Sequence, residues 1–519
     1  MQTNSRFTIK LLLLLYITSG LIFTFTPGKA FAENNTLELL EAVRLSLKHE
    51  AKIDLGKLEV SRLKSKHTQT QGEFDTILQS SLNHGETPPG SGSPQKIENT
   101  FYKFGLIKQL RSGVSIQPYV QTSRSETENS INPATSNAGA YFKVTIPLLQ
   151  GLGKTATAGQ ELAASQDVSN SRYKLKHSIN QVVKNVAVMY WDYVLAYKRK
   201  EQLREAEKRA KNKYRQIKEL VENNERPPVE LQEAKANINQ KRSDRISGER
   251  RIIQSRHNLG LAMGIPFERI ESIPPPQTEF EQIQMNQSAI RDLNKKFLIR
   301  RALNKRYDLK ASKGKKKSAN IMEEYYQDKL SPQLDMGMRL GYQGLKSGGS
   351  YNRMGDAFFA SAPGKSWQIS LTYNFPVENR ASRGRWNAQK IQKHKQLVNN
   401  RELIRTIRSN IHTELARIRK LKQELTSSKE TVDSYKQTVS NQFTKYKMGM
   451  ATQNDLIDTQ DKLTDAVLAY LSTQNNYASS LIQLRFYLSS LVNFKNDQAR
   501  VEMSNLVNLP QTQEKNRKY

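Results

Sequence analysis

The sequence predicts an α+β fold that is mainly helical, in which very long helices are joined by short strands. Apolar residues recur every seven positions over three long segments, and shorter segments alternate apolar and polar residues. The first pattern indicates helices that supercoil on one another, and the second indicates strands with one apolar face. The whole order of segments occurs twice. We therefore expect an internal two-fold duplication with a repeat of about 200 residues.

The first 32 residues are typical of a secretory signal peptide. Arg6 and Lys10 precede an apolar run from Leu11 to Phe25, and Ala30-Phe31-Ala32 provides a small-residue cleavage motif. The run is shorter than a membrane-spanning helix requires. We expect cleavage after Ala32 rather than an uncleaved anchor, and hence an exported protein.

Charge and cysteine content narrow the class further. The 519 residues include 81 Lys and Arg against 49 Asp and Glu, a net charge of +32, and no cysteine. An exported chain without cysteine has no disulfides, so packing or assembly must stabilise it. Export argues against nucleic-acid binding, and we interpret the basic segments, such as Lys198–Lys218 and Lys313–Asn320, as solvated helix faces. Attraction to anionic lipids or solutes is the alternative.

Three helical segments carry the seven-residue period. The apolar positions are Leu175, Val182, Met189, Ala196, Leu203, Ala210 and Ile217 in the first; Leu397, Ile404, Ile411, Ile418, Leu425, Val432, Val439 and Tyr446 in the second; and Leu456, Leu463, Tyr470, Tyr477 and Leu484 in the third. At 1.5 Å per residue, the helices 159–221 and 381–447 would be about 95 and about 100 Å long. Each is followed by a break and a second helix.

Four main strands are expected between the helices. The clearest are 333–343 and 367–375, and the others are 74–82 and 140–147. Such strands suit a transmembrane β-barrel or a soluble sheet with one buried face. A further pair, Phe104–Leu110 and Val114–Val120, either joins the sheet or decorates it, and Pro118 places its second run at an edge or in a loop.

The order of these segments divides the chain. We expect a first repeat at 33–264, a linker at 265–290, a second repeat at 291–495 and a polar C-terminal tail at 496–519. Four strands are too few to close a transmembrane barrel, which needs about eight. Because unpaired strand edges are not tolerated in lipid, several chains would have to combine.

Four motifs, in this order and spacing, resemble the TolC-type outer-membrane efflux family over nearly all of the mature chain. They are VTIPLLQGLGKTATAGQELAASQ, NKRYDLKASKGKKKSANIMEEYYQDKLSPQLDMGM, LTYNFPVENRASRGRWNAQK and YKMGMATQNDLIDTQDKLTDAVLAY. The resemblance implies a homotrimer in the cell outer membrane, with one shared 12-stranded barrel that continues into a long periplasmic α-helical barrel. It also implies a passive exit duct for drugs, small toxic molecules or proteins. An inner-membrane transporter would energise export through a periplasmic adaptor.

The turn before the last helix carries two carboxylates. Gly449 suits the left-handed residue that ends a helix, Thr452 can cap the next helix, and Asp455 stands at the position that completes a capping box. Capping does not require Asp458. The resemblance implies that Asp455 and Asp458 ring the periplasmic entrance, where carboxylates would attract cations.

The same resemblance implies further entrance residues. Glu230 and Tyr446 match positions of a latch that closes the entrance, but Ala451 stands where the latch arginine would be, so a latch of the usual form is not expected. The residues of the two turns would dock the adaptor: Asn224, Arg226, Pro227, Pro228, Met448, Gly449 and Met450.

Other classes fit less well. A periplasmic adaptor would have one helical hairpin, and a structural coiled-coil envelope protein would not need the strands. The chain has no recognisable catalytic or phosphate-loop motif, and its histidines show no metal-ligand pairing. We therefore expect no enzyme activity, no cofactor and no metal.

Overall fold

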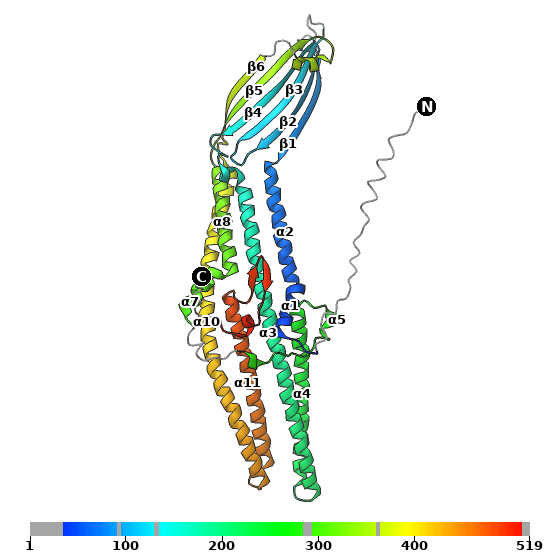
Figure 1. Cartoon of the computed structure of the whole chain (residues 1–519), viewed down its shortest axis with the longest axis vertical. Coiled ribbons are helices and arrows are strands. Elements are labelled where there is room, and N and C mark those ends of the chain that lie inside the picture. The colour runs from blue at the N-terminus through cyan, green and yellow to red at the C-terminus, as the bar shows by residue number, and fades with distance from the viewer. Residues whose placement is uncertain (1–34, 91–94, 129–133, 284–292, 360–363, 511–519) are drawn as a thin grey trace, which may run out of the picture.

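The computed structural model describes residues 35–90, 95–128, 134–283, 293–359 and 364–510. The predicted signal peptide, 1–32, lies outside them. The molecule is a long rod with a β-sheet at one end, two helical turns at the other, and short elements packed around the middle (Figure 1).

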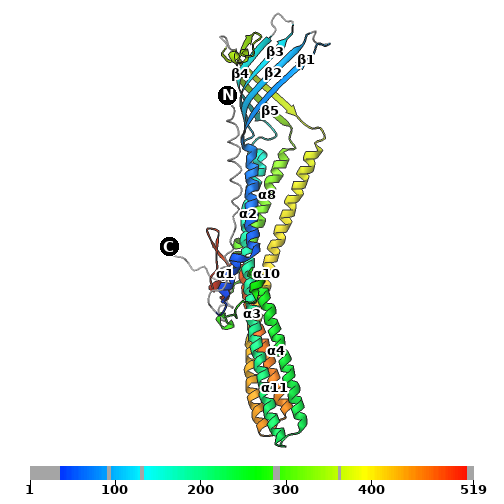
Figure 2. The same ribbon diagram turned by 90° about the vertical axis from the view of Figure 1, so that its right-hand side faces the viewer.

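Two very long helices run along the rod, as predicted. α3 (Lys154–Glu222) has 69 residues and α10 (Arg380–Lys447) has 68. Each is followed by a helix of 35 residues, α4 (Pro228–Ala262) or α11 (Gln453–Tyr487). Toward the sheet, α2 (Ala51–Gln71) lies along α3, and α8 (Tyr307–Asp328) packs against both α3 and α10 (Figure 2). The order helix, strands, long helix, shorter helix thus occurs twice.

The sheet contains six strands and not the four expected. β1 (Thr76–Thr87), β2 (Ile97–Gln109), β3 (Ser115–Thr127), β4 (Ala134–Pro147), β5 (Gln333–Ser347) and β6 (Gly364–Asn374) pair antiparallel in chain order. The uncertain pair of runs forms β2 and β3, in the interior of the sheet. The expectation that Pro118 places its run at an edge or in a loop is wrong. Pro118 is paired with Phe142 of β4, while the ladder to β2 is interrupted between Gly105 and Lys108, opposite the proline that has no N–H.

One face of this sheet is apolar and exposed. Phe142, Leu340 and Trp367 are direct neighbours across β4, β5 and β6, and their exposed fractions are 44%, 58% and 74%. Leu82, Tyr102 and Phe104 continue the apolar face on β1 and β2. The opposite face is predominantly polar, so the sheet separates an apolar from a polar environment. Within the described chain, β1 and β6 each have a free edge.

The core is thickest at mid-height. Tyr190, Trp191 and Tyr193 of α3 are fully buried, and Phe280 stacks on Trp191 at 5.3 Å between ring centroids. The Tyr190 hydroxyl donates to the Leu37 carbonyl at 2.8 Å and accepts from the Thr278 N–H at 3.0 Å. These bonds fasten both the start of the described chain and the predicted linker to α3.

Short elements complete the middle region. The part of the predicted polar tail that the structure describes is folded: Leu506 lies in the core, and residues 498–510 include a strand and a short helix. The short elements among the described residues are α1 (Leu39–His49), η1 (Gly72–Phe74), α5 (Phe267–Ile270), η2 (Phe280–Gln282), α7 (Lys295–Lys305), α9 (Arg353–Asp356), η3 (Ala357–Phe359), β7 (Asn493–Lys495), β8 (Gln498–Arg500) and α12 (Ser504–Val507).

Among the described residues, no helix combines the length and the apolar character needed to cross a membrane.

Candidate functional site

The two helical turns lie together at the end of the rod farthest from the sheet (Figures 1 and 2). In the first turn, Asn224 has a φ of 61°, and the Glu225 N–H donates to the Leu220 carbonyl at 2.8 Å. This left-handed residue ends α3. Pro227 then precedes α4 and Pro228 is its first residue, where a missing N–H has no cost.

The second turn follows the prediction. Gly449 has a φ of 75°, and the Met450 N–H donates to the Lys445 carbonyl at 2.9 Å, which closes α10. The Thr452 hydroxyl accepts from the Asp455 N–H at 3.2 Å, and an Asp455 carboxylate oxygen accepts from the Thr452 N–H at 2.9 Å. Asp455 therefore completes the capping box that the sequence indicated.

Both aspartates are exposed and have local partners. Hydrogen bonds from Thr452 lower the pKa of the Asp455 carboxyl. Asp458 pairs with Lys462 one helical turn later, at 2.6 Å between Oδ2 and Nζ. Neither carboxylate contacts the other predicted entrance residues, Glu230 and Tyr446, within a single chain.

Those two residues belong to a contact between the two helix pairs, which we call the tip cluster: Lys213, Arg226, Glu230 and Tyr446. The Lys213 Nζ lies 3.3 Å from the centroid of the Tyr446 ring, and the Arg226 guanidinium carbon lies 5.6 Å from it. Arg226 also pairs with Glu230 at 3.5 Å. Arg226 thus places a guanidinium beside Tyr446, although Ala451 stands at the expected arginine position.

Burial shapes the electrostatics of the tip cluster. It lowers the pKa of Lys213 to about 8, with a further contribution from the nearby positive charge of Arg226. Burial also raises the pKa of the Tyr446 hydroxyl. Within the described residues, Lys213 Nζ, Tyr446 Oη and Glu230 Oε2 are buried without a hydrogen-bond partner. Buried polar atoms without partners cost free energy, so the packed form of the tip cluster is less stable than a fully bonded contact would be.

Sequence reasoning missed Lys213. Its segment was interpreted as a solvated helix face, yet Lys213 is only 8% exposed. The available signal was its spacing: it stands three residues after Ala210 and four before Ile217, and both of these lie on the apolar seam. A lysine at that spacing faces the neighbouring helix rather than water.

The residues predicted to dock a partner are mainly on the outside of the turns. Met448 and Met450 have exposed fractions of 64% and 67%, and Asn224, Pro227 and Pro228 are also exposed. Arg226 is half-buried because it belongs to the tip cluster. Exposed methionines on the second turn and exposed prolines on the first therefore present apolar side chains at the end of the rod.

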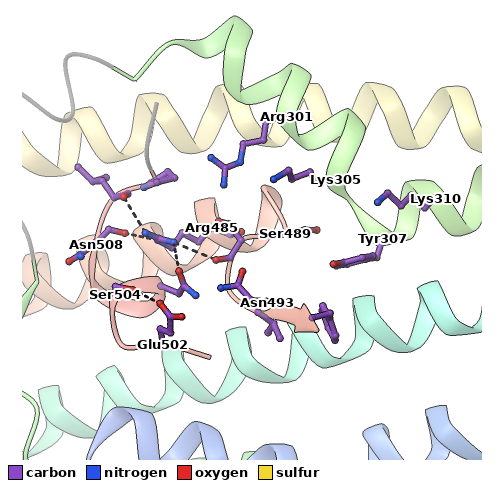
Figure 3. A pocket seen from close by; sticks show the side chains of 16 residues that line it. Arg301, Lys305, Tyr307, Lys310, Arg485, Ser489, Asn493, Glu502, Ser504 and Asn508 are labelled. Carbon is purple, nitrogen blue, oxygen red and sulfur yellow. Dashed lines mark hydrogen bonds between the residues drawn. The ribbon is translucent and has the colours of Figure 1, made fainter. Parts of the chain in front are cut away.

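A separate pocket of about 660 Å³ lies at mid-height, between α7, α8 and the folded C-terminal segment (Figure 3). Arg485 lies at its centre and donates to the carbonyls of Ser490, Asn508 and Leu509. This arginine holds the C-terminal segment against α11. None of the predicted site residues lines the pocket. Among the described residues, no group of His, Asp or Glu side chains is arranged to hold a metal ion.

Comparison with protein families finds a match in the second half of the chain. Residues 298–490 match the family model of outer membrane efflux proteins. Over these residues the chain is similar to outer membrane efflux proteins. This confirms the resemblance and its expected cellular location, the outer membrane with an extension into the periplasm. Members of this efflux family are not enzymes, in agreement with the expectation from the sequence.

Solved structures of outer membrane channels share the fold of this chain. The Campylobacter jejuni CmeC outer membrane channel has a TM-score of 0.62 and 16% identity, over 87% of this chain and 85% of that one. The Neisseria gonorrhoeae MtrE outer membrane channel in its open state has a TM-score of 0.59 and 15% identity, over 87% of this chain and 88% of that one. The outer membrane protein VceC from Vibrio cholerae has a TM-score of 0.61 and 11% identity, over 87% of this chain and 96% of that one. No curated protein matches the sequence.

Proposed function

We propose that three copies of this chain form an exit channel of the outer membrane. An inner-membrane transporter energises export, and a periplasmic adaptor connects it to the channel. One observation carries this proposal: a single chain has an amphipathic sheet with two free edges at one end of the rod and two exposed helical turns at the other. In lipid, the free edges must pair with strands of further copies. The turns at the other end of the rod are exposed and available to the periplasmic adaptor.

The direction of the strands allows the copies to close a ring. The six strands alternate in direction, so β6 of one copy is antiparallel to β1 of the next. Three copies contribute 3 × 6 = 18 strands, whereas four strands per chain would give the 12 expected from the resemblance. With strands about 4.8 Å apart and tilted by about 40°, an 18-stranded barrel measures about 36 Å between opposite backbones, against about 24 Å for 12 strands.

The tip cluster is then the brace that keeps the periplasmic end narrow. It joins α10 to the first helix pair inside each copy, so the second pair moves outward only if the contact of Tyr446 with Lys213 and Arg226 breaks. Arg226 supplies the cation that Ala451 cannot. Asp455 and Asp458 lie next to this brace on α11, where three copies bring six carboxylates to the entrance.

The apolar ends of the turns suit an adaptor. Met448 and Met450 on one turn offer flexible apolar contacts, and Pro227 and Pro228 on the other turn offer rigid ones. Three copies present six such turns in a ring. The adaptor would therefore contact the channel end to end, through turns rather than along the helices.

Cross-linking tests the assembly, and the absence of native cysteine makes it specific. Cysteines are placed singly at Gln79, Ser81 or Asn83 of β1 and combined with cysteines at Gln368, Ser370 or Thr372 of β6. We expect at least one combination to yield covalent trimers in outer-membrane fractions. The matched control combines Ser81→Cys with Gln121→Cys of β3, which one strand separates within a copy.

The same preparations also test for the result that would contradict the proposal. If the protein is recovered only from the soluble periplasm or the inner membrane, or if no combination links separate copies, the exit-channel proposal is wrong. Closure at another copy number would appear directly as a different covalent oligomer.

A further inference from the structure

We propose that the polar face of the sheet carries an anion-binding belt, which selects anionic solutes in the outer-membrane part of the channel. The inference rests on the proposed function, since the polar face lines a lumen only when the barrel is closed. Its residues are Lys103, Tyr119, Tyr141, Lys143 and Arg339, from four adjacent strands, and we call them the belt. None of them belongs to the entrance.

Two tyrosines form the centre of the belt. Tyr119 of β3 and Tyr141 of β4 are direct cross-strand partners, and their rings stack with centroids 5.1 Å apart. Their outer neighbours in the same row are glycines, Gly105 of β2 and Gly341 of β5. A Cβ at either glycine would lie 2.4 Å from an atom of the adjacent tyrosine. The glycines therefore let both rings lie flat against the wall, where Tyr141 is only 6% exposed.

Cations flank this aromatic pair on both sides. The Lys103 Nζ of β2 lies 4.4 Å from the Tyr119 centroid, and the Arg339 guanidinium carbon of β5 lies 5.6 Å from the Tyr141 centroid. The order across the sheet is thus cation, ring, ring, cation. Contact with the ring faces holds the two long side chains at the wall. Ordered cations lose less side-chain entropy when they bind an anion than mobile ones would.

A third cation, Lys143, leaves the belt with positive charge that no carboxylate in the described part of the chain balances. Lys143 is the direct cross-strand partner of Arg339, and like charges in that arrangement destabilise a sheet. Within the described residues, no ion pair involves Lys103, Lys143 or Arg339. Asp335 lies on the same face, four residues along β5 from Arg339 and at the end next to the helices. A bound anion between the cations offsets their repulsion.

Three copies multiply the arrangement. They bring 3 × 3 = 9 belt cations to one level of the barrel, with three Asp335 carboxylates nearer the helical end. In a barrel about 36 Å wide the cations attract solutes by their summed field rather than by enclosing them. The ligand class is therefore broad, namely solutes that carry carboxylate or phosphate groups, and binding at the belt is weak enough to permit passage.

Reversal potentials of the purified trimer in a planar bilayer test the belt. The measurements use a KCl gradient and the Asp455→Ala, Asp458→Ala background, which removes the carboxylates of the entrance. We expect this background to prefer chloride over potassium. Adding Lys143→Gln and Arg339→Gln should shift the reversal potential toward the potassium value. The matched control is Lys346→Gln with Lys365→Gln, which removes the same charge from the other face of the sheet.

A second measurement needs no belt variant. On wild-type channels, tripolyphosphate added on the barrel side should block at lower concentration than spermidine added on that side. The opposite order, or a reversal potential that is equal in the belt variant and its background, overturns the belt while leaving the channel intact. A purified trimer that forms no conducting pore overturns the proposed function itself, so the two failures are distinct.

Discussion

The ammonium group of Lys213 lies 3.3 Å from the ring centroid of Tyr446, although the two residues come from different helix pairs. Each residue is less than 10% exposed. Burial between the helix pairs disfavours the charged form of the ammonium group, and separation of the pairs would hydrate it. The two helix pairs are therefore expected to separate and repack reversibly at this contact.

The packed state of the contact between Lys213 and Tyr446 should become more stable as pH rises. Burial lowers the pKa of Lys213 to about 8, below its ordinary value of 10.5. Between these values the separated state binds a proton that the packed state has lost, so raising the pH favours the packed state. The raised pKa of Tyr446 keeps its hydroxyl neutral in this window. Spin labels at Glu225→Cys and Met450→Cys should report a narrower distance distribution at pH of about 9.5 than at about 7.

Lys213→Met is the matched variant for that measurement. It keeps a long apolar side chain on the Tyr446 ring and removes the titrating group. We expect a narrow distribution at both pH values. A pH response of unchanged size in this variant would assign the titration to another group.

Arg226→Ala should open the periplasmic end. The change removes the guanidinium beside Tyr446 and leaves the Glu230 carboxylate without its ion-pair partner. We expect a larger open-channel fraction in single-channel recordings and increased uptake of a bulky antibiotic by cells. Lys218→Ala is the control, because Lys218 forms an exposed ion pair with Glu222 on the same stretch of the rod. Equal behaviour of the two variants would exclude Arg226 from the brace.

Capping and cation attraction at Asp455 can be separated. Thr452→Ala removes the cap but keeps both carboxylates, so it should destabilise the start of α11 by about 1 kcal/mol without changing the block by multivalent cations. Asp455→Ala with Asp458→Ala should weaken that block. The readouts are hydrogen exchange of the first turn of α11 and single-channel conductance with added cations. An unchanged block in the double variant would remove both aspartates from the entrance.

Arg485→Met should release the C-terminal segment. The arginine donates to the carbonyls of Asn508 and Leu509, and without it these buried acceptors lose their partner. We expect faster proteolysis between residues 490 and 510 and a lower melting temperature of the trimer. The control is Arg500→Met, an exposed position on β8. Equal protease sensitivity of the two variants would contradict the anchoring role of Arg485.

Local chemistry explains what could be predicted from the sequence. The seven-residue period located α3 and α10 because apolar seams demand it, and Gly449 with Thr452 and Asp455 specified the second turn through backbone conformation and capping. Each of these features depends on residues within one or two helical turns. Such information is fully present in a short stretch of sequence.

Features that depend on distant neighbours could not be predicted. β2 and β3 lack a clear alternation, because glycine at position 105 accommodates a tyrosine of the next strand and Pro118 interrupts a ladder that β4 maintains on its other side. The tip cluster joins residues more than 200 positions apart, and Arg226 replaces in space what Ala451 lacks in sequence. Only the folded arrangement brings these groups together.

The hydroxyl of Tyr190 has a mechanical consequence. By bonding both Leu37 and Thr278, it fixes the start of the described residues and the predicted linker to one point of α3 at mid-height. Asn475 of α11 contacts Asp192, and Asn258 of α4 lies at the same height, so α11 extends for about 35 Å and α4 for about 45 Å below that level. If these segments rotate about that point, a swing of about 10° displaces their ends by about 6 to 8 Å. In the proposed trimer, a small rotation below Tyr190 would therefore widen the periplasmic end without moving the sheet.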